Sequence, residues 1–222
     1  KGLEKSRLSA EDYQSLVIDM LNKFGGNGVD QRIMHFFSPT NVQWCSDDML
    51  QKIKGFANSI GTGIHIHLHE TIYQKMYGSR YYGKTPLAHL YELGFTGNEV
   101  SCAHGVWLTN DDIGLLAQTG TMVCHNASSN LRLQSGIMPL NRLLDQNVTV
   151  AIGIDESGIN DDNDMLQEMR LVQKIHRVPG ISSPSPTSHQ VLHMATANGA
   201  KATFFEDRVG TLEPGKRADL VL

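Results

Sequence analysis

Three histidines occupy every second position of one short apolar stretch, and a glutamate follows them. The stretch is GIHIHLHET, residues 63–71, in which His65, His67 and His69 alternate with apolar side chains and Glu70 comes next. A period of two places the histidines on one side of a strand and the apolar residues on the other. Imidazole is a common metal ligand, and a carboxylate can transfer protons. The stretch therefore indicates a metal ligand beside a catalytic base. A strand with a histidine-rich wet face is the simpler alternative.

Three further polar residues each end an apolar run later in the chain. His104 ends EVSCAH, His125 ends TMVCH and Asp155 ends VTVAIGID. Counted from His67, successive members lie roughly 20 to 40 residues apart, close to the about 30 residues of one unit in a (β/α)8 barrel. The C-terminal ends of barrel strands share one face, so the four side chains would converge there. In a doubly wound sheet they would share one edge but be spread along it.

Strands that alternate with helices would position these residues. Strands are expected where short apolar runs rich in branched or aromatic residues lie between turn residues, at 32–37, 63–69, 99–104, 121–125 and 148–155. Helices are expected where capping residues precede apolar positions at helical spacing, at 9–26, 85–94, 109–120 and 163–177. This alternation predicts an α/β fold with parallel strands and crossover helices.

Composition limits the class of protein. The 222 residues, 40% hydrophobic and 19% charged, suffice for one globular domain. The formal net charge of −4 provides no basic surface for a phosphate backbone, so no nucleic-acid partner is expected. No apolar run approaches the roughly 20 residues that cross a bilayer, so no membrane partner is expected. Cys45, Cys102 and Cys124 lack paired metal-site spacing, which favours a reducing, cytoplasmic location.

Five motifs, taken together and in order, resemble the metal-dependent amidohydrolase superfamily. They are HLHE, SCAHG, HNASSNLRLQSGI, GIDESGINDDNDMLQEMRL and VGTLEPGKRADLVL. The most similar branch contains cytosine, guanine and S-adenosylhomocysteine deaminases and triazine chlorohydrolases. The resemblance implies a (β/α)8 TIM-type barrel, of which this chain would hold strands 4 to 8. Residues 1–208 would be the C-terminal part of the barrel, and 209–222 a strand returning to a small β-sandwich domain.

The resemblance also implies a role for each matched residue. His67 would bind the metal, and Glu70 would be the proton shuttle. His104 would contact the substrate or the attacking water, with metal ligation as an alternative, and Asp155 would bind metal and help deprotonate the water. The substrate-binding positions would be Phe37, His125, Ser128, Asn130 and Glu156. The metal would be divalent, with Zn2+ the first expectation and Fe2+ or Mn2+ as alternatives.

The implied activity is hydrolytic deamination of an aminated N-heterocycle resembling a nucleobase, by attack of metal-bound hydroxide on a ring carbon. A chlorohydrolase of the triazine type is an alternative, because pocket loops decide the leaving group. A metal-free, catalytically incomplete fragment is the other alternative, because the His-x-His ligand pair of the family's first strand has no match in these residues. Phe37 stands where adenosylhomocysteine deaminases have a substrate-binding histidine, which bears against a nucleoside substrate. A homo-oligomer is also expected.

Overall fold

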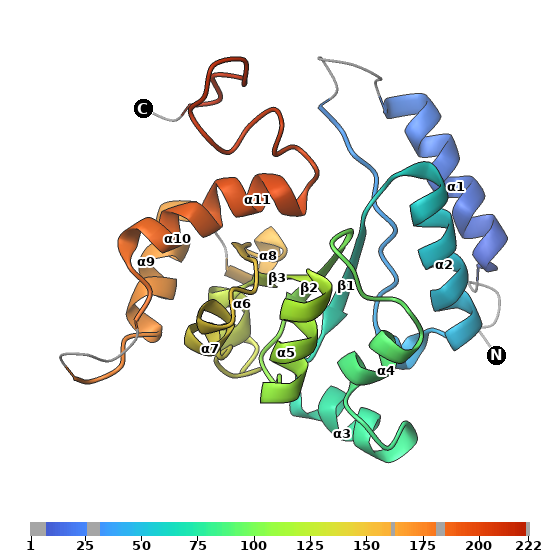
Figure 1. The fold of residues 1–222 in the computed structure, drawn as a ribbon, viewed down its shortest axis with the longest axis horizontal. Coiled ribbons are helices and arrows are strands. Elements are labelled where there is room, and N and C mark those ends of the chain that lie inside the picture. Colours follow the sequence, from blue (N-terminus) through green and yellow to red (C-terminus); the bar gives the residue numbers. More distant parts are fainter. Residues whose placement is uncertain (1–7, 26–31, 161–162, 181–184, 221–222) are drawn as a thin grey trace.

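A parallel four-stranded sheet forms the centre of the molecule (Figure 1). The structure is a computed structural model and describes residues 8–25, 32–160, 163–180 and 185–220. The strands are β1 (Ile64–Leu68), β2 (Val100–His104), β3 (Met122–His125) and β4 (Val150–Ile152). They pair in chain order, β1-β2-β3-β4. A doubly wound sheet reverses its strand order at a switch point, so this uninterrupted order fits part of a barrel wall.

The segment before β1 joins the sheet through single bridges. Phe37 forms a parallel bridge with Ile64, and Asn41 forms one with His67. The prediction of a strand over 32–37 is therefore wrong in its bounds, because pairing begins only at Phe37 and runs to Asn41. The strand predicted at 148–155 is likewise shorter, since the ladder covers Val150–Ile152.

Helices connect and flank the strands, and the four predicted helical regions are all helical. Their first turns carry the expected caps: Ser9 accepts from the backbone N–H of Asp12, and Thr109 forms a capping box with Asp112. The helices are α1 (Ala10–Phe24), η2 (Val42–Trp44), α2 (Asp47–Ile60), α3 (Ile72–Tyr81), α4 (Pro86–Glu92), α5 (Asn110–Thr119), α6 (Ala127–Arg132), α7 (Leu140–Asp145), α8 (Ser157–Asn160), α9 (Met165–Ile175), α10 (Ser188–Ala195) and α11 (Ala197–Ala202). The α/β prediction is confirmed.

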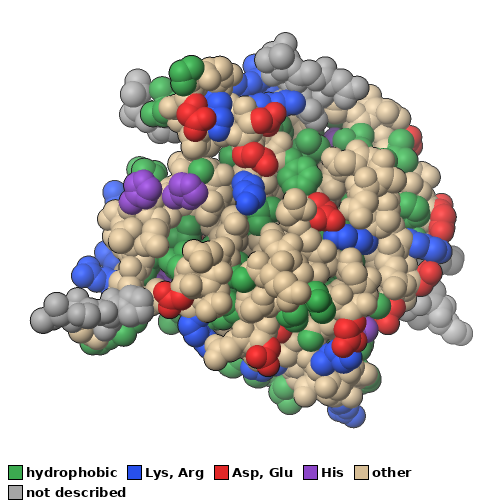
Figure 2. All heavy atoms as spheres, viewed as in Figure 1, with side chains coloured by type: hydrophobic (Ala, Val, Ile, Leu, Met, Phe, Trp, Pro, Cys, Tyr) green, Lys and Arg blue, Asp and Glu red, His purple; other side chains and the backbone are tan. Residues whose placement is uncertain are grey.

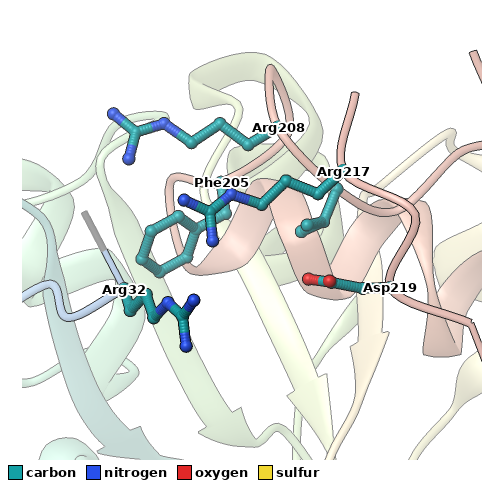
Figure 3. A pocket seen from close by; sticks show the side chains of 6 residues that line it. Arg32, Phe205, Arg208, Arg217 and Asp219 are labelled. Carbon is teal, nitrogen blue, oxygen red and sulfur yellow. The ribbon is translucent and has the colours of Figure 1, made fainter. Parts of the chain in front are cut away.

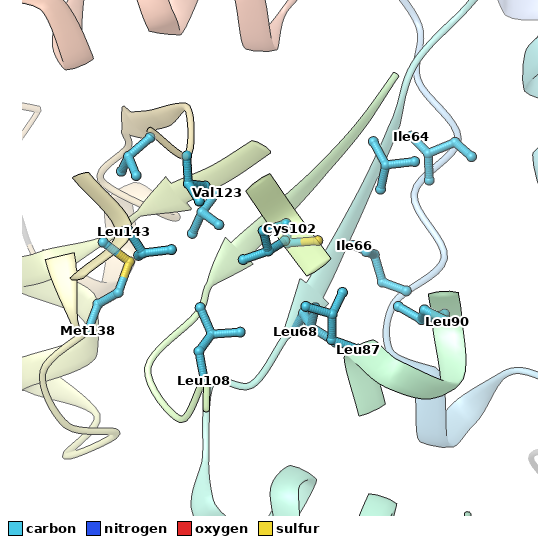
Figure 4. Close-up of a cluster of buried hydrophobic side chains, with 14 of the residues drawn as sticks. Ile64, Ile66, Leu68, Leu87, Leu90, Cys102, Leu108, Val123, Met138 and Leu143 are labelled. Atoms are coloured by element: carbon cyan, nitrogen blue, oxygen red, sulfur yellow. The ribbon is translucent and has the colours of Figure 1, made fainter. Parts of the chain in front are cut away.

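The hydrophobic core lies between the sheet and the helices (Figure 4). In β1 the side chains of Ile64, Ile66 and Leu68 are buried, whereas His65 and His67 are only partly buried. This alternation matches the sequence pattern. Burying one such aliphatic side chain contributes about 1.5–3 kcal/mol, so the apolar side of β1 fixes which way its histidines face.

The chain beyond α11 forms turns and bends (Figure 1). Over 209–220 no strand is present, and residues 221 and 222 lie outside the described part, so the return strand to a β-sandwich stays a prediction. On the face shown in Figure 2, Lys and Arg side chains are interspersed with Asp and Glu. Among the described residues, no helix combines the length and apolar character needed to cross a membrane.

Candidate active site

Two imidazoles and two carboxylates meet at the C-terminal ends of the strands. The rings of His67 and His104 stack with centroids 5.4 Å apart and planes 22° apart. His104 Nε2 lies 4.0 Å from Glu70 Oε2 and 3.8 Å from Asp155 Oδ2. These four residues, called the strand-end cluster below, come from positions spread over nearly 90 residues of sequence, roughly three β/α units. The structure brings together the four residues to which the sequence assigned metal binding and proton transfer.

His104 reaches the cluster through an unusual backbone conformation. It ends β2 opposite Leu68, whose side chain is buried in the core. A regular strand would send the side chain of His104 to that same side. Its φ of 78° is left-handed, as is the φ of 65° at Asp155. Non-glycine residues in such conformations cost of order 1–3 kcal/mol and concentrate at functional sites.

The side chain of His69 lies on the opposite side of the sheet from the one that strand alternation predicts. Strand alternation places it beside His65 and His67, but its φ is 52° and its side chain is fully buried. Its Nε2 lies 3.8 Å from Asp112 Oδ2 at the start of α5. Burial lowers the pKa of His69 to about 4, partly opposed by the charge of Asp112. His69 therefore contacts the helix layer and not the strand-end cluster.

Neighbouring polar groups orient the histidines of β1. Thr40, in the bridging segment, accepts a hydrogen bond of 2.8 Å through its carbonyl oxygen from His67 Nδ1. Nδ1 of His67 therefore carries a hydrogen, and in the neutral ring Nε2 keeps a lone pair, the arrangement that metal-binding histidines commonly show. His65 Nδ1 lies 2.7 Å from Ser101 Oγ, and burial lowers the pKa of His65 to about 4.

Helix α6 contacts the cluster at two points. Ser129 Oγ donates to Asp155 Oδ2 at 2.6 Å, and Asn130 Oδ1 lies 2.9 Å from His104 Nδ1. Sequence reasoning singled out Asn130 but missed Ser129, although both belong to the recognised SSN segment. The segment alone did not show which of the two adjacent serines, Ser128 or Ser129, would contact the cluster.

The acidic residue that anchors α6 was also missed. The backbone N–H of Ser128 donates to Glu168 Oε1 at 3.0 Å, and Glu168 is only 1% exposed. Glu168 lies in α9, in a segment whose spacing indicated core packing. A buried carboxylate at the first turn of a helix is stabilised by the free N–H groups there.

Two of the predicted substrate-binding residues do not face the cluster. Phe37 is fully buried, and its ring meets that of Tyr13 edge to face at 5.4 Å. His125 is also fully buried, and its Nε2 lies 2.8 Å from Nε2 of His176. His125 keeps an ordinary backbone at the end of β3, so its side chain stays on the helix side, where Val123 also packs.

The remaining predicted substrate-binding residues lie around Asp155 and α6. Glu156 is exposed and donates its backbone N–H to Asp155 Oδ1 at 3.0 Å. Ser128 is buried with its hydroxyl oxygen unpaired in the structure. Asn130 is buried with its Nδ2 unpaired. Substrate contact by these residues stays a prediction.

The donor types of the cluster fit a divalent metal, but their number falls short of a full ligand set. His67 offers a free Nε2 and Asp155 a carboxylate, both normal zinc ligands. Within the described ranges, no group of three or more His, Cys, Asp or Glu side chains is arranged to hold a metal ion.

A separate hollow lies beside the C-terminal segment (Figure 3). It has a volume of about 340 Å3 and is lined by Arg32, Phe205, Arg208, Val209, Arg217 and Asp219. No member of the strand-end cluster lines it. The hollow is therefore distinct from the candidate site.

The fold and the cluster together define a parallel α/β barrel wall with a hydrolase-type polar site at its strand ends. Residues 4–222 match the model of the amidohydrolase family. The chain belongs to the amidohydrolase family.

Relatives and solved structures agree with this assignment. The chain is 40% identical over 196 residues to a 5-methylthioadenosine/S-adenosylhomocysteine deaminase of Thermococcus onnurineus, with 88% of this chain and 46% of the relative covered. It is 39% identical over 193 residues to a 5'-deoxyadenosine deaminase of Methanosarcina barkeri, with 87% and 44% covered. The chain spans about half the length of the curated relatives it matches.

Two solved structures share the fold. An adenosine deaminase from Xanthomonas campestris with bound zinc superposes with a TM-score of 0.83 at 29% identity, covering 94% of this chain and 47% of that one. A zinc complex of atrazine chlorohydrolase from Arthrobacter aurescens gives a TM-score of 0.88 at 23% identity, with 95% and 46% covered. The predicted amidohydrolase barrel fold is confirmed.

Proposed function

We propose that the protein containing this chain is a metal-dependent hydrolase that removes ammonia from an aminated N-heterocycle. The observation that carries the proposal is the convergence of Glu70, His104 and Asp155, with His104 Nε2 at 4.0 and 3.8 Å from the two carboxylates. Groups that give and take protons within such distances of one another are what hydrolysis of a C–N bond requires. The relatives named as deaminases support the same reaction.

Different residues of the chain have different roles in the proposed reaction. A divalent metal, when bound through His67 and Asp155 with further ligands, supplies an activated water at neutral pH. Zinc is the first candidate because the similar adenosine deaminase binds it. Asp155 takes a proton from the water, His104 orients the attacking oxygen, and Glu70 carries a proton to the leaving nitrogen. Water adds at the ring carbon, the C–N bond breaks, and ammonia leaves.

Purine nucleosides with an altered 5' position are the substrates to test first. The deaminases of Thermococcus onnurineus and Methanosarcina barkeri are named for such molecules. The likeness to atrazine chlorohydrolase is at 23% identity and supports the fold alone, so deamination is the stronger proposal. We place the protein in the cytoplasm, in keeping with its three free cysteines, and propose a homo-oligomer.

A metal-free, catalytically incomplete fragment is the second candidate, because the described residues hold no group of three or more His, Cys, Asp or Glu arranged to bind a metal ion. Metal content and deamination rate, measured on the gene product that contains this chain, separate the two candidates. In the enzyme, Glu70→Gln retains the metal and lowers kcat by at least about 100-fold, because proton transfer contributes that much. Asp155→Asn loses both metal and turnover.

The control for these variants is Glu92→Gln, because Glu92 is an exposed carboxylate paired with Lys84 on the surface. It is expected to keep the metal and the rate of the unaltered protein. Full metal content and full rate in Asp155→Asn would show that the site is assigned to the wrong residues. An unaltered protein without metal or turnover would support the metal-free candidate.

A further inference from the structure

Helix α6 holds both the carboxylate and the imidazole of the candidate site. Ser129 and Asn130 are adjacent, and both are buried. Ser129 Oγ donates to Asp155 Oδ2 at 2.6 Å, and Asn130 Oδ1 lies 2.9 Å from His104 Nδ1. The side chains of Asp155 and His104 come from different strand ends, so α6 is the element that joins them.

The contact with Asn130 determines which nitrogen of His104 carries the proton. An amide oxygen only accepts, so His104 Nδ1 must donate, and in the neutral imidazole Nε2 then keeps its lone pair. Nε2 is the atom that faces Glu70 and Asp155. A lone pair that faces two carboxylates suits a site that receives a cation or the hydrogen of a water molecule. The tautomer set by Asn130 therefore decides what the cluster can bind.

The contact with Ser129 fixes the direction of the Asp155 carboxylate. Its Oδ1 accepts from the backbone N–H of Glu156 at 3.0 Å, and its Oδ2 accepts from Ser129. Because Asp155 follows β4 with a left-handed backbone, the strand ladder does not hold it. These two hydrogen bonds therefore set its orientation.

Helix α6 is too short to hold itself in place, and α9 anchors it. The N–H of Ser128, in the first turn, donates to the buried Glu168 Oε1 at 3.0 Å. Breaking this hydrogen bond would leave a buried carboxyl group without that partner, which is costly. The position of α6 thus depends on a carboxylate outside the strand-end cluster.

We propose that α6 is a positioning element, in which Asn130 fixes the tautomer of His104, Ser129 orients Asp155, and neither side chain binds the substrate. The expected effect on kcat rests on the proposed function. The tautomer of His104 can be measured whether or not the protein has that activity. The positioning role proposed for Asn130 replaces the substrate-binding role that the sequence suggested for it.

The kinetic test compares Asn130→Leu, which removes the acceptor, with Asn130→Asp, which keeps an oxygen at that place. We expect kcat of Asn130→Leu to fall about 10- to 100-fold with KM nearly unchanged, a loss typical of a hydrogen bond in a charged site. Asn130→Asp is expected to stay within about 10-fold of the original kcat, because the acceptor for Nδ1–H remains. If KM rises while kcat is retained, Asn130 binds substrate and the proposal is wrong.

The tautomer test uses protein labelled with 15N in its histidines, with His104→Gln to assign the resonance. In the unaltered protein and in Asn130→Asp, the His104 signal should be that of the Nδ1–H form. In Asn130→Leu the Nε2–H form should be populated. An unchanged His104 tautomer in Asn130→Leu overturns the proposal, whether or not the protein deaminates anything. Turnover absent from the unaltered protein would count against the proposed function alone.

Ser129 provides the parallel test. Ser129→Ala should lower kcat about 10-fold or more, since a hydrogen bond to a carboxylate is lost, whereas Ser129→Thr keeps the hydroxyl and should restore most of the rate. Equal rates in Ser129→Ala and the original protein would contradict the orienting role. Should Asn130→Leu fail to fold, Asn130→Ala also removes the acceptor with a smaller side chain and has the same two readouts.

Discussion

His104 and His125 occupy equivalent places in neighbouring strands and face opposite sides of the sheet. Each is the last residue of its strand and directly follows the paired residues Ala103 and Cys124. His104 turns through a left-handed backbone to meet Glu70 and Asp155, whereas His125 continues the strand and meets His176 in the helix layer. The left-handed φ of His104 therefore places its side chain in the candidate site, whereas the side chain of His125 lies in the packed interior.

The two histidines also differ in electrostatic surroundings. His104 faces two carboxylates, and its partner His67 is partly open to solvent. His125 is fully buried, and its near neighbour His176 is a second imidazole. Burial lowers the pKa of His125 to about 3, and the charge of His176 acts in the same direction. The first environment suits proton transfer, and the second suits two neutral rings that share one hydrogen bond.

The largest expected effect comes from removing each imidazole in turn. His104→Gln should lower kcat/KM by about 100- to 10,000-fold, the usual range for a group that transfers or orients protons. Its melting temperature should change little. His125→Gln should keep kcat/KM within a few fold, because its side chain points away from the cluster. Equal losses of activity in the two variants would show that His104 and His125 do not differ in their importance for the reaction.

A double-mutant cycle on His125 and His176 tests the interior pair. His125→Leu leaves a buried nitrogen of His176 without its partner, which should cost about 1–3 kcal/mol of unfolding free energy in urea. His125→Leu combined with His176→Leu removes both polar groups and should recover part of that loss. If the losses of unfolding free energy in the two single variants simply add up in the double variant, the two rings have no interaction energy. The 2.8 Å contact between their Nε2 atoms would then not stabilise the fold.

A pH dependence of stability is a further expected effect. Burial lowers the pKa of His125 to about 3 and that of His176 to about 4, below the ordinary value near 6.5. The unfolded chain therefore binds more protons than the folded chain below pH 6.5, so stability should be greatest above pH 6.5 and fall as the pH drops towards 4. The expected slope is at most about 1.4 kcal/mol per pH unit for each histidine.

Chemical denaturation of the unaltered protein and of the His125→Leu, His176→Leu double variant, at pH 7.5, 6.0 and 5.0, measures this slope. The pKa values of His65 and His69 are also lowered to about 4 by burial, so the double variant should keep some acid sensitivity. The difference between the two slopes of unfolding free energy against pH gives the contribution of His125 and His176. Identical slopes would mean that the pair titrates alike in the folded and unfolded chains.

Strand periodicity and the order of motifs were enough to predict the sheet, its parallel direction and the members of the strand-end cluster. They were not enough to predict which way a residue just at or beyond a strand end points. His69 was expected beside His67 and faces Asp112 instead, and His104 makes the opposite change. Both depend on a left-handed backbone, which contacts distant in sequence stabilise and local residue preference does not reveal.

The supporting contacts were harder to predict than the cluster itself. Ser129 and Glu168 act through partners 26 and 40 residues away in sequence. Their residue types are common on helix surfaces, where a hydroxyl or a carboxylate usually meets water. Only the packing of α6 against α8 and α9 brings these side chains to their partners.

The sheet order has a consequence for how the chain acquires its structure. Each strand pairs with the strand next to it along the chain. A nascent polypeptide could therefore add one β/α unit at a time to the growing sheet as it leaves the ribosome, without waiting for a distant C-terminal segment. Asp155, which follows β4, is the last member of the strand-end cluster to be synthesised, so His67, Glu70 and His104 are made before the cluster can form.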